Sequence, residues 1–464
     1  MIASSEDTIV ALATPPGLGA LAIVRLSGPA SIEAADTIFR GRKKLKDLEG
    51  FEGAFGTCVK DDHLLDEMVA WVYRAPHSYT GENLVELSCH GGFVSAERIL
   101  GALRSAGCRL AEPGEFTRRA FLNGRIDLAQ AEAVAEVIGA RGQRAQEQAL
   151  VHLQGGLSDR IEAIASPLRD VLARLTVYLD FDEDVPEPPN LELLQERISE
   201  SRASLSSLIQ SRESHRAEQD GVVVALVGRP NVGKSSLMNA LAGFDRAIVH
   251  DAPGTTRDVL ELTLDWDGVP VTLIDTAGIR ELEEGRGAEV EREGIERSYR
   301  AAKRADLIFW VADGSDSPKE SDFDIGKRVP EDKPLLVILN KSDIGQAESK
   351  WVSSYSPHYI VNVSAKTGEG IPKIRDLARG MIVNLGGDFG DSESVWITSD
   401  RHVDLLKSAD GSCARAIEIL KSGQPSELAA ADLTKALVEL GQVSGHDAGS
   451  DLLDRIFSTF CIGK

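Results

Sequence analysis

The glycine-rich octapeptide GRPNVGKS (Gly228 to Ser235) has the residues and the order that phosphate binding requires. It follows the apolar run 222–227, which predicts a buried strand, and it precedes a helical segment. The glycines allow backbone N–H groups to surround phosphates, while Lys234 can reach the β- and γ-phosphates and the Ser235 hydroxyl can ligate Mg²⁺. The pattern predicts a phosphate loop whose contacts are Asn231, Val232, Gly233, Lys234, Ser235 and Ser236.

Two later segments contain the groups expected to meet the metal and the γ-phosphate. DAPGTTRD places Thr256 in a loop where its hydroxyl can complete the Mg²⁺ shell, although the segment could also be a plain turn. VTLIDTAG ends an apolar strand at Asp275, which can hold the metal's water shell, and the Gly278 amide can meet the γ-phosphate. The expected contacts are His250, Asp251, Ala252, Pro253, Gly254, Thr255, Thr256, Asp275, Thr276, Ala277 and Gly278.

A third apolar strand, LLVILN, leads into the motif NKSD, which selects the base. Asp343 can accept hydrogen bonds from the ring N–H and the exocyclic amine of guanine, and Asn340 can read the other edge. Adenine would leave the Asp343 carboxylate unpaired, so the pattern indicates GTP rather than ATP. The remaining expected contacts are Lys341, Ser364, Ala365 and Lys366.

The position that orients the attacking water in Ras-like GTPases is unusual here. Those proteins have a glutamine directly after the DTAG glycine, whereas this sequence has Ile279, which cannot orient water. Either hydrolysis is very slow or a group further along the loop orients the water. The following acidic stretch offers many carboxylates, most of which are typical of a solvated surface.

Motifs outside the nucleotide pocket resemble the bacterial MnmE (TrmE) family of tRNA modification GTPases over essentially the whole chain. They are ATPPGLGALAIVRLSG, SYTGENLVELSCHGG, GEFTRRAFLNGRIDLAQAEA and the final FCIGK. The resemblance implies a potassium-dependent GTPase with Mg²⁺. The K⁺ ligands are expected at Asn231, His250, Ala252 and Thr255, although Asn231 could be only a turn residue. A monovalent cation there can neutralise charge that an arginine would otherwise stabilise.

The same resemblance implies that Glu291 positions the water, that Lys234 assists catalysis, and that two GTPase domains face each other during hydrolysis. It also implies an N-terminal domain that dimerises and binds a tetrahydrofolate derivative, either 5-formyl- or 5,10-methylene-tetrahydrofolate. The folate contacts are expected at Arg25, Glu82, Arg125 and Lys464, although each alone is also typical of a surface charge. Cys461 is either a reactive group near the folate or a buried, inert thiol that docks the tail.

Composition and charge restrict the function further. The 464 residues carry a net charge of −22, so any contact with RNA must be local, weak or shared with a partner. The segment RGRKKLK (Arg40 to Lys46) has five cations in seven residues and is either such a contact or a solvated loop. The five scattered cysteines favour reduced thiols, and no apolar run predicts a membrane span or export, so we expect a cytoplasmic protein.

Periodicity predicts a multidomain protein in which a Ras-like α/β GTPase domain is inserted into a helical domain. Residues 1–118 show an α+β pattern, and the resemblance implies that they form the folate-binding-like domain. Residues 119–216 and 384–464 have helical spacing and form the two parts of one all-α domain, the second ending in CIGK. Residues 217–383 form the GTPase domain.

The combined expectation is a homodimeric GTPase that forms a 5-carboxymethylaminomethyl or aminomethyl substituent on the wobble uridine (position 34) of certain tRNAs. The resemblance implies a flavoprotein partner of the MnmG (GidA) type in a heterotetramer. FAD would belong to that partner, because this sequence has no GxGxxG fingerprint. The alternatives are a ribosome-assembly GTPase that binds rRNA, and a folate-dependent aminomethyl transferase merely regulated by its GTPase. The acidic helical segment after the GTPase domain disfavours the first alternative.

Overall fold

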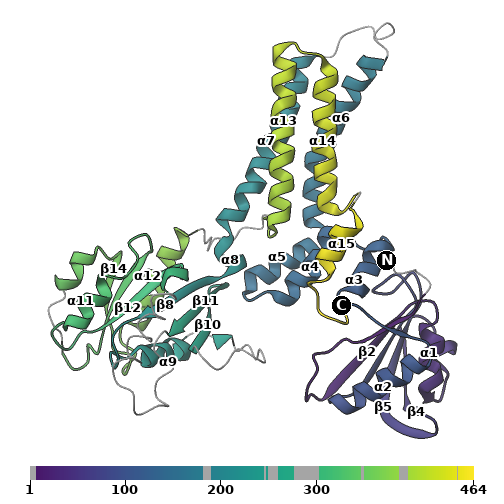
Figure 1. Cartoon of the computed structure of the whole chain (residues 1–464), viewed down its shortest axis with the longest axis horizontal. Coiled ribbons are helices and arrows are strands. Elements are labelled where there is room, and N and C mark those ends of the chain that lie inside the picture. Colours follow the sequence, from purple (N-terminus) through teal and green to yellow (C-terminus); the bar gives the residue numbers. More distant parts are fainter. Residues whose placement is uncertain are drawn as a thin grey trace. The chain divides into compact units, whose positions relative to one another are not determined.

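The computed structural model describes residues 7–180, 190–244, 247–248, 260–275, 302–345, 350–385, 395–446 and 448–464 (Figure 1). By packing, the chain divides into two compact units. The first comprises residues 1–138, 151–202 and 404–464, and the second comprises 139–150 and 203–403. The domain boundaries expected from sequence remain predictions, and the one at residue 118 falls inside helix α3 (Glu115–Leu122).

The N-terminal domain is a seven-stranded sheet with the strand order β3-β4-β5-β6-β2-β1-β7. Its strands are β1 (Ile9–Leu12), β2 (Leu21–Ser27), β3 (Phe39–Gly41), β4 (Glu52–Lys60), β5 (His63–Tyr73), β6 (Leu84–His90) and β7 (Arg109–Leu110). All neighbours are antiparallel except β1 and β7. One face packs against α1 (Ser31–Ile38) and α2 (Phe93–Ser105) and forms an apolar core.

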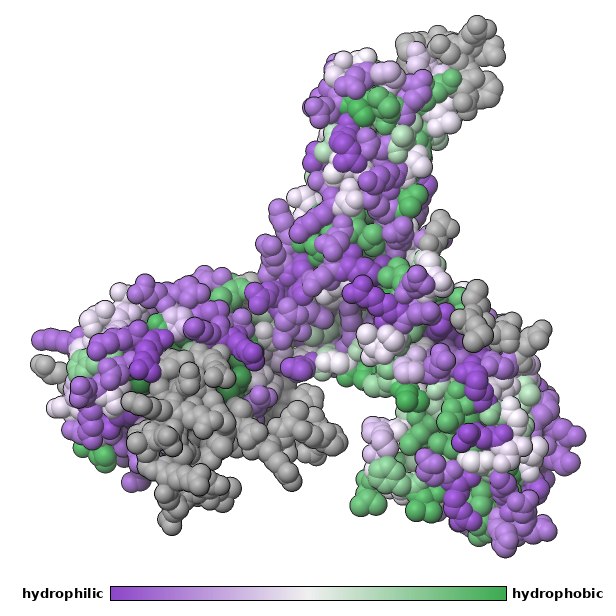
Figure 2. All heavy atoms as spheres, viewed as in Figure 1, coloured by the Kyte–Doolittle hydropathy of each residue, from purple (hydrophilic) through white to green (hydrophobic). Residues whose placement is uncertain are grey.

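The opposite face of this sheet is not covered by these helices, and the alternation of side chains decides which residues lie on it. In β6, for example, Val85, Leu87 and Cys89 are buried in the core, so Glu86 points the other way. Apolar side chains also gather on the exposed surface of this domain (Figure 2). Leu18 is 99% exposed, and Leu21, Phe93 and Val94 are also exposed.

Segments from both sides of the GTPase domain meet in one helical domain, as predicted. In the first unit the helices are α3, α4 (Leu128–Gly139), α6 (Gly156–Asp180), α7 (Leu191–Ser214, whose end belongs to the second unit), α13 (Asp400–Ser422), α14 (Ser426–Ser444) and α15 (Ser450–Phe457). Helix α8 (Arg216–Asp220) and most of α5 (Gln143–Leu153) belong to the second unit. Helix α6 packs along α14 (Figure 1). Arg202 of α7 forms an ion pair at 2.8 Å with Asp410 of α13, and apolar faces at helical spacing complete the packing.

The GTPase domain is a second seven-stranded sheet with the strand order β14-β13-β12-β8-β11-β10-β9. The strands are β8 (Val222–Val227), β9 (Ala247–Ile248), β10 (Leu260–Trp266), β11 (Val269–Asp275), β12 (Leu307–Asp313), β13 (Leu335–Asn340) and β14 (Tyr359–Asn362). Strands β14 to β11 are mutually parallel and almost wholly apolar, as expected for a sheet covered on both faces.

Separate apolar clusters lie on the two faces of this sheet. One includes α9 (Lys234–Phe244) and α12 (Ile371–Val383), and the other includes α11 (Glu320–Gly326) and the turn Lys350–Tyr355. This arrangement confirms the predicted Ras-like architecture. Among the described residues, none of the helices is both long and apolar enough to cross a bilayer.

Candidate functional site

The phosphate loop connects β8 to α9, as the sequence predicts. Gly228 (φ 157°) and Gly233 (φ 95°) adopt backbone conformations that favour glycine. A Cβ at Gly228 would lie 2.3 Å from the Val311 carbonyl oxygen, and one at Gly233 would lie 2.3 Å from Asn340 Nδ2. Both glycines are therefore required by the close approach of the neighbouring strands β12 and β13 as well as by the turn.

Three polar side chains meet where the phosphates and the metal are expected. Lys234 is buried, and its Nζ donates to the carbonyl oxygens of Gly228 (2.8 Å) and Arg229 (3.1 Å). Burial lowers the pKa of the Lys234 ammonium, and nearby Asp275 acts against this effect. The Ser235 hydroxyl donates to Asp275 Oδ2 at 3.1 Å. These oxygens provide the hard donor set that Mg²⁺ prefers.

Several predicted contacts of the nucleotide and the metals fall outside the described residues. They are His250, Asp251, Ala252, Pro253, Gly254, Thr255, Thr256, Thr276, Ala277, Gly278 and Glu291. Of the expected K⁺ ligands, Asn231 is described. It is exposed and has a left-handed backbone (φ 62°), so its side-chain oxygen lies at the surface of the phosphate loop. Val232 is buried beneath the loop, and Ser236 is exposed on α9.

The base-selecting loops lie at the carboxyl ends of β13 and β14. Ser364 Oγ donates to Asp343 Oδ1 at 2.8 Å, which fixes the orientation of the exposed Asp343 carboxylate. Within the described part of the chain, the other oxygen of Asp343 has no hydrogen-bond partner, so it can accept one from a base. Lys366 is exposed beside this loop.

Asn340 forms two hydrogen bonds within the protein, and its expected role in reading the base stays a prediction. This side chain is 2% exposed, and both of its polar atoms bind the protein. Its Nδ2 donates to the Val232 carbonyl oxygen at 2.9 Å, and its Oδ1 accepts from the Ala365 amide at 3.0 Å. Asn340 therefore joins the phosphate loop to the SAK loop, and the second N–H of its amide can still donate to a base.

Sequence reasoning missed Asp313, which lies at the carboxyl end of β12. Asp313 Oδ2 accepts from Lys341 Nζ at 2.7 Å, and Oδ1 accepts from the amide and hydroxyl of Ser315. Burial acts to raise the pKa of Asp313, but the hydrogen bonds from Lys341 and Ser315 hold it below its usual value. The backbone of Lys341 is left-handed (φ 70°), and the contact with Asp313 holds the end of its side chain.

A second missed pair binds the phosphate loop to helix α11. Arg229 Nε lies 3.1 Å from Asp322 Oδ2, and the same oxygen accepts from the Lys319 amide at the start of α11. Asp322 is 1% exposed. Because Arg229 is held by this buried carboxylate, it is poorly placed to reach towards a phosphate as a catalytic arginine.

Asp313→Asn is expected to accelerate release of a fluorescent guanosine diphosphate by about five- to tenfold. The reason is that Lys341 loses the carboxylate that holds its ammonium in place. Stopped-flow dissociation measures this rate. The ratio of affinities for guanosine and inosine diphosphate should not change, because Asp343 still reads the exocyclic amine. Asp316→Asn is the matched control, since Asp316 is 58% exposed and its ion pair within the described residues is with exposed Lys319. Equal release rates for Asp313→Asn and wild type would contradict this role.

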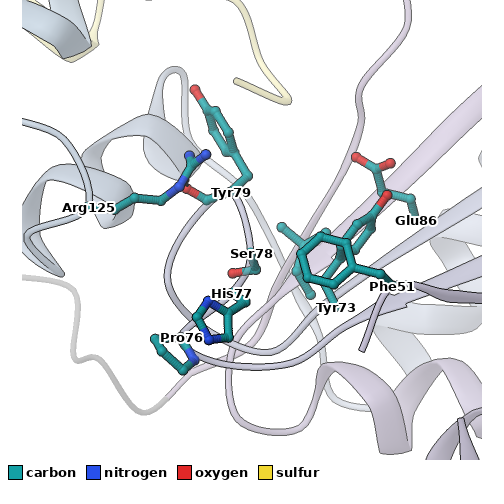
Figure 3. Close-up of a pocket in the computed structure, with 9 residues that line it drawn as sticks. Phe51, Tyr73, Pro76, His77, Ser78, Tyr79, Glu86 and Arg125 are labelled. Atoms are coloured by element: carbon teal, nitrogen blue, oxygen red, sulfur yellow. Dashed lines mark hydrogen bonds between the residues drawn. The ribbon is translucent and has the colours of Figure 1, made fainter. Parts of the chain in front are cut away.

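A cavity of about 500 Å³ lies in the N-terminal domain (Figure 3). Phe51 and Tyr73 form one wall, with ring centroids 5.5 Å apart and an edge-to-face angle of 88°. Arg125 and Tyr79 lie across from them, and Glu86 contributes a carboxylate. The remaining lining residues are Pro76, His77, Ser78 and Leu84. The combination of aromatic walls with opposite charges suits a flat polar heterocycle.

Arg25 connects this cavity to the C-terminal tail. It pairs with Glu86 at 2.7 Å, and its Nη1 donates to the Gly463 carbonyl oxygen at 3.2 Å. Arg25 and Arg125 lie 5.3 and 5.2 Å from the centre of the Tyr79 ring, so cation–π contacts hold both arginines. Three of the four predicted folate contacts, Arg25, Arg125 and Lys464, therefore gather near one cavity.

The tail is bound by its backbone as well as by apolar packing. The Phe116 amide donates to the Lys464 carbonyl oxygen at 3.2 Å, and Leu453, Phe457 and Phe460 are buried against α4. A Cβ at Gly463 (φ 93°) would lie 2.5 Å from the Leu12 carbonyl oxygen, so only glycine fits there. Burial lowers the pKa of the Lys464 ammonium and nearby Arg25 adds to this, while Glu86 opposes it.

The docked tail presents Cys461 as an exposed, free thiol, in contrast to Cys58, Cys89, Cys108 and Cys413, which are buried. The alternative of a buried thiol is therefore wrong for Cys461. Burial raises the pKa of Cys58 to about 12, so that thiol stays protonated.

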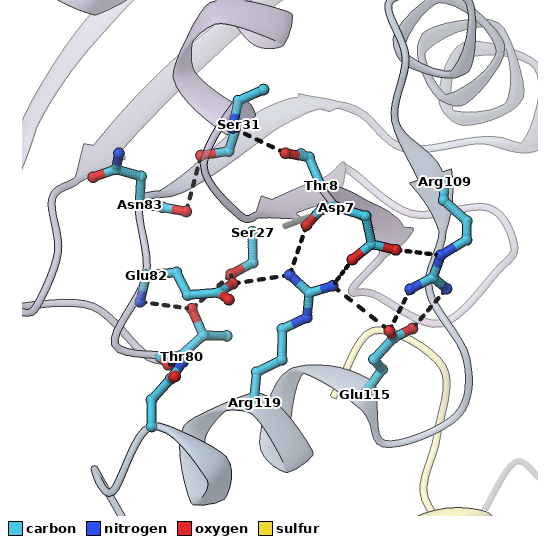
Figure 4. Close-up of polar contacts among 12 residues, drawn as sticks. Asp7, Thr8, Ser27, Ser31, Thr80, Glu82, Asn83, Arg109, Glu115 and Arg119 are labelled. Atoms are coloured by element: carbon cyan, nitrogen blue, oxygen red, sulfur yellow. Dashed lines mark hydrogen bonds and ion pairs between the residues drawn. The ribbon is translucent and has the colours of Figure 1, made fainter. Parts of the chain in front are cut away.

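The folate contact expected of Glu82 stays a prediction, but in the structure this carboxylate does not line the cavity and lies in a different network (Figure 4). Glu82 Oε2 accepts from Ser27 Oγ at 2.7 Å and from Arg119 Nη1 at 3.0 Å. Arg119, which is 7% exposed, also pairs with Asp7 at 2.5 Å. Glu82 therefore secures α3 to the sheet, and Glu86 is the carboxylate that lines the cavity. Alternation along β6 is the sequence signal that could have identified Glu86.

Two family models match this chain. One, described as the "GTP-binding protein TrmE N-terminus", matches residues 8–125, and the other, the "MnmE helical domain", matches residues 128–461. The second match spans more than half of the chain and includes the GTPase domain between the two helical segments.

Curated relatives match over nearly the full length. The tRNA modification GTPase MnmE of Clostridioides difficile (strain 630) is 38% identical over 99% of this chain and 99% of its own length. The protein of the same name from Chlorobium phaeovibrioides is 39% identical over 99% of this chain and 98% of its own. That from Carboxydothermus hydrogenoformans is 41% identical over 99% of this chain and 100% of its own.

Proposed function

The chain belongs to the MnmE family of tRNA modification GTPases, and we propose that it forms an aminomethyl-type substituent at C5 of the wobble uridine with a one-carbon unit from a tetrahydrofolate derivative. The main support for this proposal is that the chain contains two separate sites with the residues these two ligands require. One is a guanine-nucleotide cradle, and the other is an aromatic cavity with Arg25, Glu86 and Arg125 around it. GTP hydrolysis would drive rearrangement of the protein and would not contribute atoms to the product.

In the nucleotide cradle, each residue has a separate task. Lys234 leaves its two carbonyl partners to bind the phosphates, and Ser235 and Asp275 hold Mg²⁺ directly and through its water shell. When bound, Mg²⁺ supplies electrostatic stabilisation of the phosphates. Asp343 holds the guanine edge, and Asp313 fixes Lys341 beside it. Glu291 remains the proposed water-positioning group.

A bound K⁺ would add positive charge beside the phosphates to that of Lys234. Arg229 is occupied by Asp322, and Lys234 is the buried cation of the loop. Asn231 offers an exposed side-chain oxygen, and the proposed remaining ligands are His250, Ala252 and Thr255. We expect two GTPase domains of a homodimer to face each other and close the loop over this ion.

The exposed apolar cluster at one end of the N-terminal sheet supports dimerisation. Leu18, Leu21, Phe93 and Val94 are all more than 60% exposed. The loops that carry them touch, since a Cβ at Gly91 would lie 2.1 Å from the Gly19 carbonyl oxygen. A second copy of this domain would remove these side chains from water.

The cavity residues fit a reduced pterin. Glu86 can pair with the amidine-like edge of the ring, Arg25 and Arg125 can hold its anionic parts, and Phe51 and Tyr73 can enclose its faces. Glu86 and burial raise the pKa of the Tyr73 phenol, so this group remains a neutral donor. Lys464 and Cys461 lie on the docked tail, where we propose that they face the ligand and its one-carbon unit.

Glu86→Gln is expected to weaken binding of 5-formyl-tetrahydrofolate by about 10- to 100-fold, because a charge-assisted pair is lost. Isothermal titration calorimetry on the full chain measures this change. Glu67→Gln is the control, because Glu67 is exposed on neighbouring β5 and does not line the cavity. Glu82→Ala would be a poor test, since it would leave the buried Arg119 charge short of a partner and destabilise the fold. Unchanged affinity of Glu86→Gln would overturn the cavity assignment.

We also propose a cytoplasmic location, a heterotetramer with an FAD-containing partner of the MnmG (GidA) type, and tRNA as the shared substrate. Ion-exchange co-purification of the two proteins, followed by mass measurement of the complex, tests the partner. A mass other than that of two copies of each protein would exclude the heterotetramer.

A further inference from the structure

A basic loop lies beside the cavity of the N-terminal domain and is not used by the sites described above. It begins in edge strand β3 with Arg40 and continues with Arg42, Lys43, Lys44 and Lys46, all of which are exposed. Arg40 donates to backbone carbonyls at the end of α1, and Lys43 pairs with Glu52 at 2.9 Å. In the described part of the chain, Arg42, Lys44 and Lys46 form no ion pair. Asp47 and Glu49 are the exposed carboxylates that follow them.

The loop is held rigidly even though its cations are exposed. Leu45 and Leu48 are 0% and 1% exposed and anchor it in the core. Asp36 Oδ1 accepts from the Leu45 amide at 2.7 Å, and Arg74 Nη2 donates to the carbonyl oxygens of Lys46 and Leu48, both at 2.8 Å. Cations on a fixed platform lose less freedom on binding than cations on a flexible tail.

The loop leads directly to an exposed aromatic residue at the cavity. Phe51 is 63% exposed and has a left-handed backbone (φ 63°), which is uncommon for a bulky residue. Its amide donates to the Val72 carbonyl oxygen at 2.8 Å. Its ring touches Tyr73 through an edge-to-face contact, which leaves a ring face available for stacking (Figure 3).

We propose that this surface, residues 40–51, binds a single-stranded segment of the tRNA substrate. Phosphates would contact Arg42, Lys44 and Lys46, and one base would stack on Phe51 at the cavity. Fixed cations beside an exposed aromatic ring are the features that single-stranded nucleic acids require. A net charge of −22 repels a polyanion elsewhere, so a local cationic surface decides where RNA docks. This inference rests on the proposed function, in which the tRNA base is modified at the cavity.

The test measures binding of an anticodon stem-loop RNA to the full chain by fluorescence anisotropy over a KCl series. The triple variant Arg42→Gln, Lys44→Gln, Lys46→Gln should lose at least about tenfold in affinity, and its slope against the logarithm of salt should fall by about two. The control triple variant Arg160→Gln, Arg174→Gln, Lys421→Gln makes the same change in net charge at exposed helix positions, and it should bind like wild type.

Phe51→Ala should weaken RNA binding by about tenfold without changing the salt slope, because stacking is not ionic. Phe55→Ala, which removes a ring that is 66% exposed but does not line the cavity, should have no effect. Equal RNA binding by the loop variant and wild type, or equal losses in the two triple variants, would overturn the proposal. Loss of binding to the flavoprotein with unchanged RNA affinity would assign the surface to a protein and also overturn it.

Folate binding by the loop variant, measured in parallel, separates this proposal from the cofactor assignment. The loop variant should bind 5-formyl-tetrahydrofolate as wild type does, because its three cations do not line the cavity. If wild type binds RNA through the loop but no folate, the cofactor assignment fails and the RNA surface stands.

Discussion

Asp343→Asn is expected to reduce affinity for GTP by at least about 100-fold, because the amide cannot accept both guanine N–H donors. The structure strengthens this expectation, since the Ser364 hydroxyl donates to one oxygen of Asp343 and orients the carboxylate. The same variant should bind xanthosine triphosphate better than wild type does, because xanthine presents a carbonyl oxygen where guanine has an amine. Equilibrium titration with fluorescent nucleotides measures both affinities.

Asp332→Asn is the control for this experiment, since Asp332 is an exposed carboxylate of the same domain. It should leave both affinities unchanged. If Asp343→Asn retained wild-type affinity for GTP, guanine would have to be recognised by other residues.

Hydrolysis of GTP is expected to be at least about tenfold faster in KCl than in NaCl of equal ionic strength, and Asn231→Ala should remove most of this difference. The physical reason is that charge develops on the phosphates and needs a nearby cation. Arg229 cannot supply it while it is paired with the buried Asp322. Phosphate release at saturating GTP, measured in the two salts, gives the ratio.

The control for the potassium experiment is Asn239→Ala, an exposed asparagine on α9 away from the phosphate loop. It should keep the full dependence on K⁺. Equal turnover of the wild-type protein in the two salts would eliminate the monovalent ion from the mechanism.

The elements of the nucleotide cradle could be predicted from sequence because each motif is local and follows an apolar strand. The runs ending at Val227, Asp275 and Asn340 are the strands β8, β11 and β13. Helical spacing likewise predicted the discontinuous helical domain. The apolar pattern of the tail correctly indicated that it packs, since Leu453 and Phe457 are buried.

Roles that depend on contacts between distant segments could not be predicted. Asn340 is occupied because Val232 and Ala365, both far from it in sequence, approach its two polar atoms. The pairing of Asp313 with Lys341 exists because β12 and β13 end side by side. Motif spacing contains no information about either contact.

The motif also did not show that Glu86, and not Glu82, lines the cavity. Both lie in the same motif, but β6 begins at Leu84, and strand alternation places Glu86 opposite Arg25 on the uncovered face. Glu82 precedes the strand and meets Arg119 of α3. The pattern of buried residues in LVELSCH contained this information, whereas the motif alone did not.

The most direct test of the proposed function is mass spectrometry of wobble uridines in tRNA from cells that lack this chain, complemented with wild type or with single variants. Wild type should restore the aminomethyl-type modification, and Asp343→Asn and Glu86→Gln should each fail, because one disables the nucleotide site and the other the cavity. Full restoration by both variants would contradict the proposal that both sites serve tRNA modification.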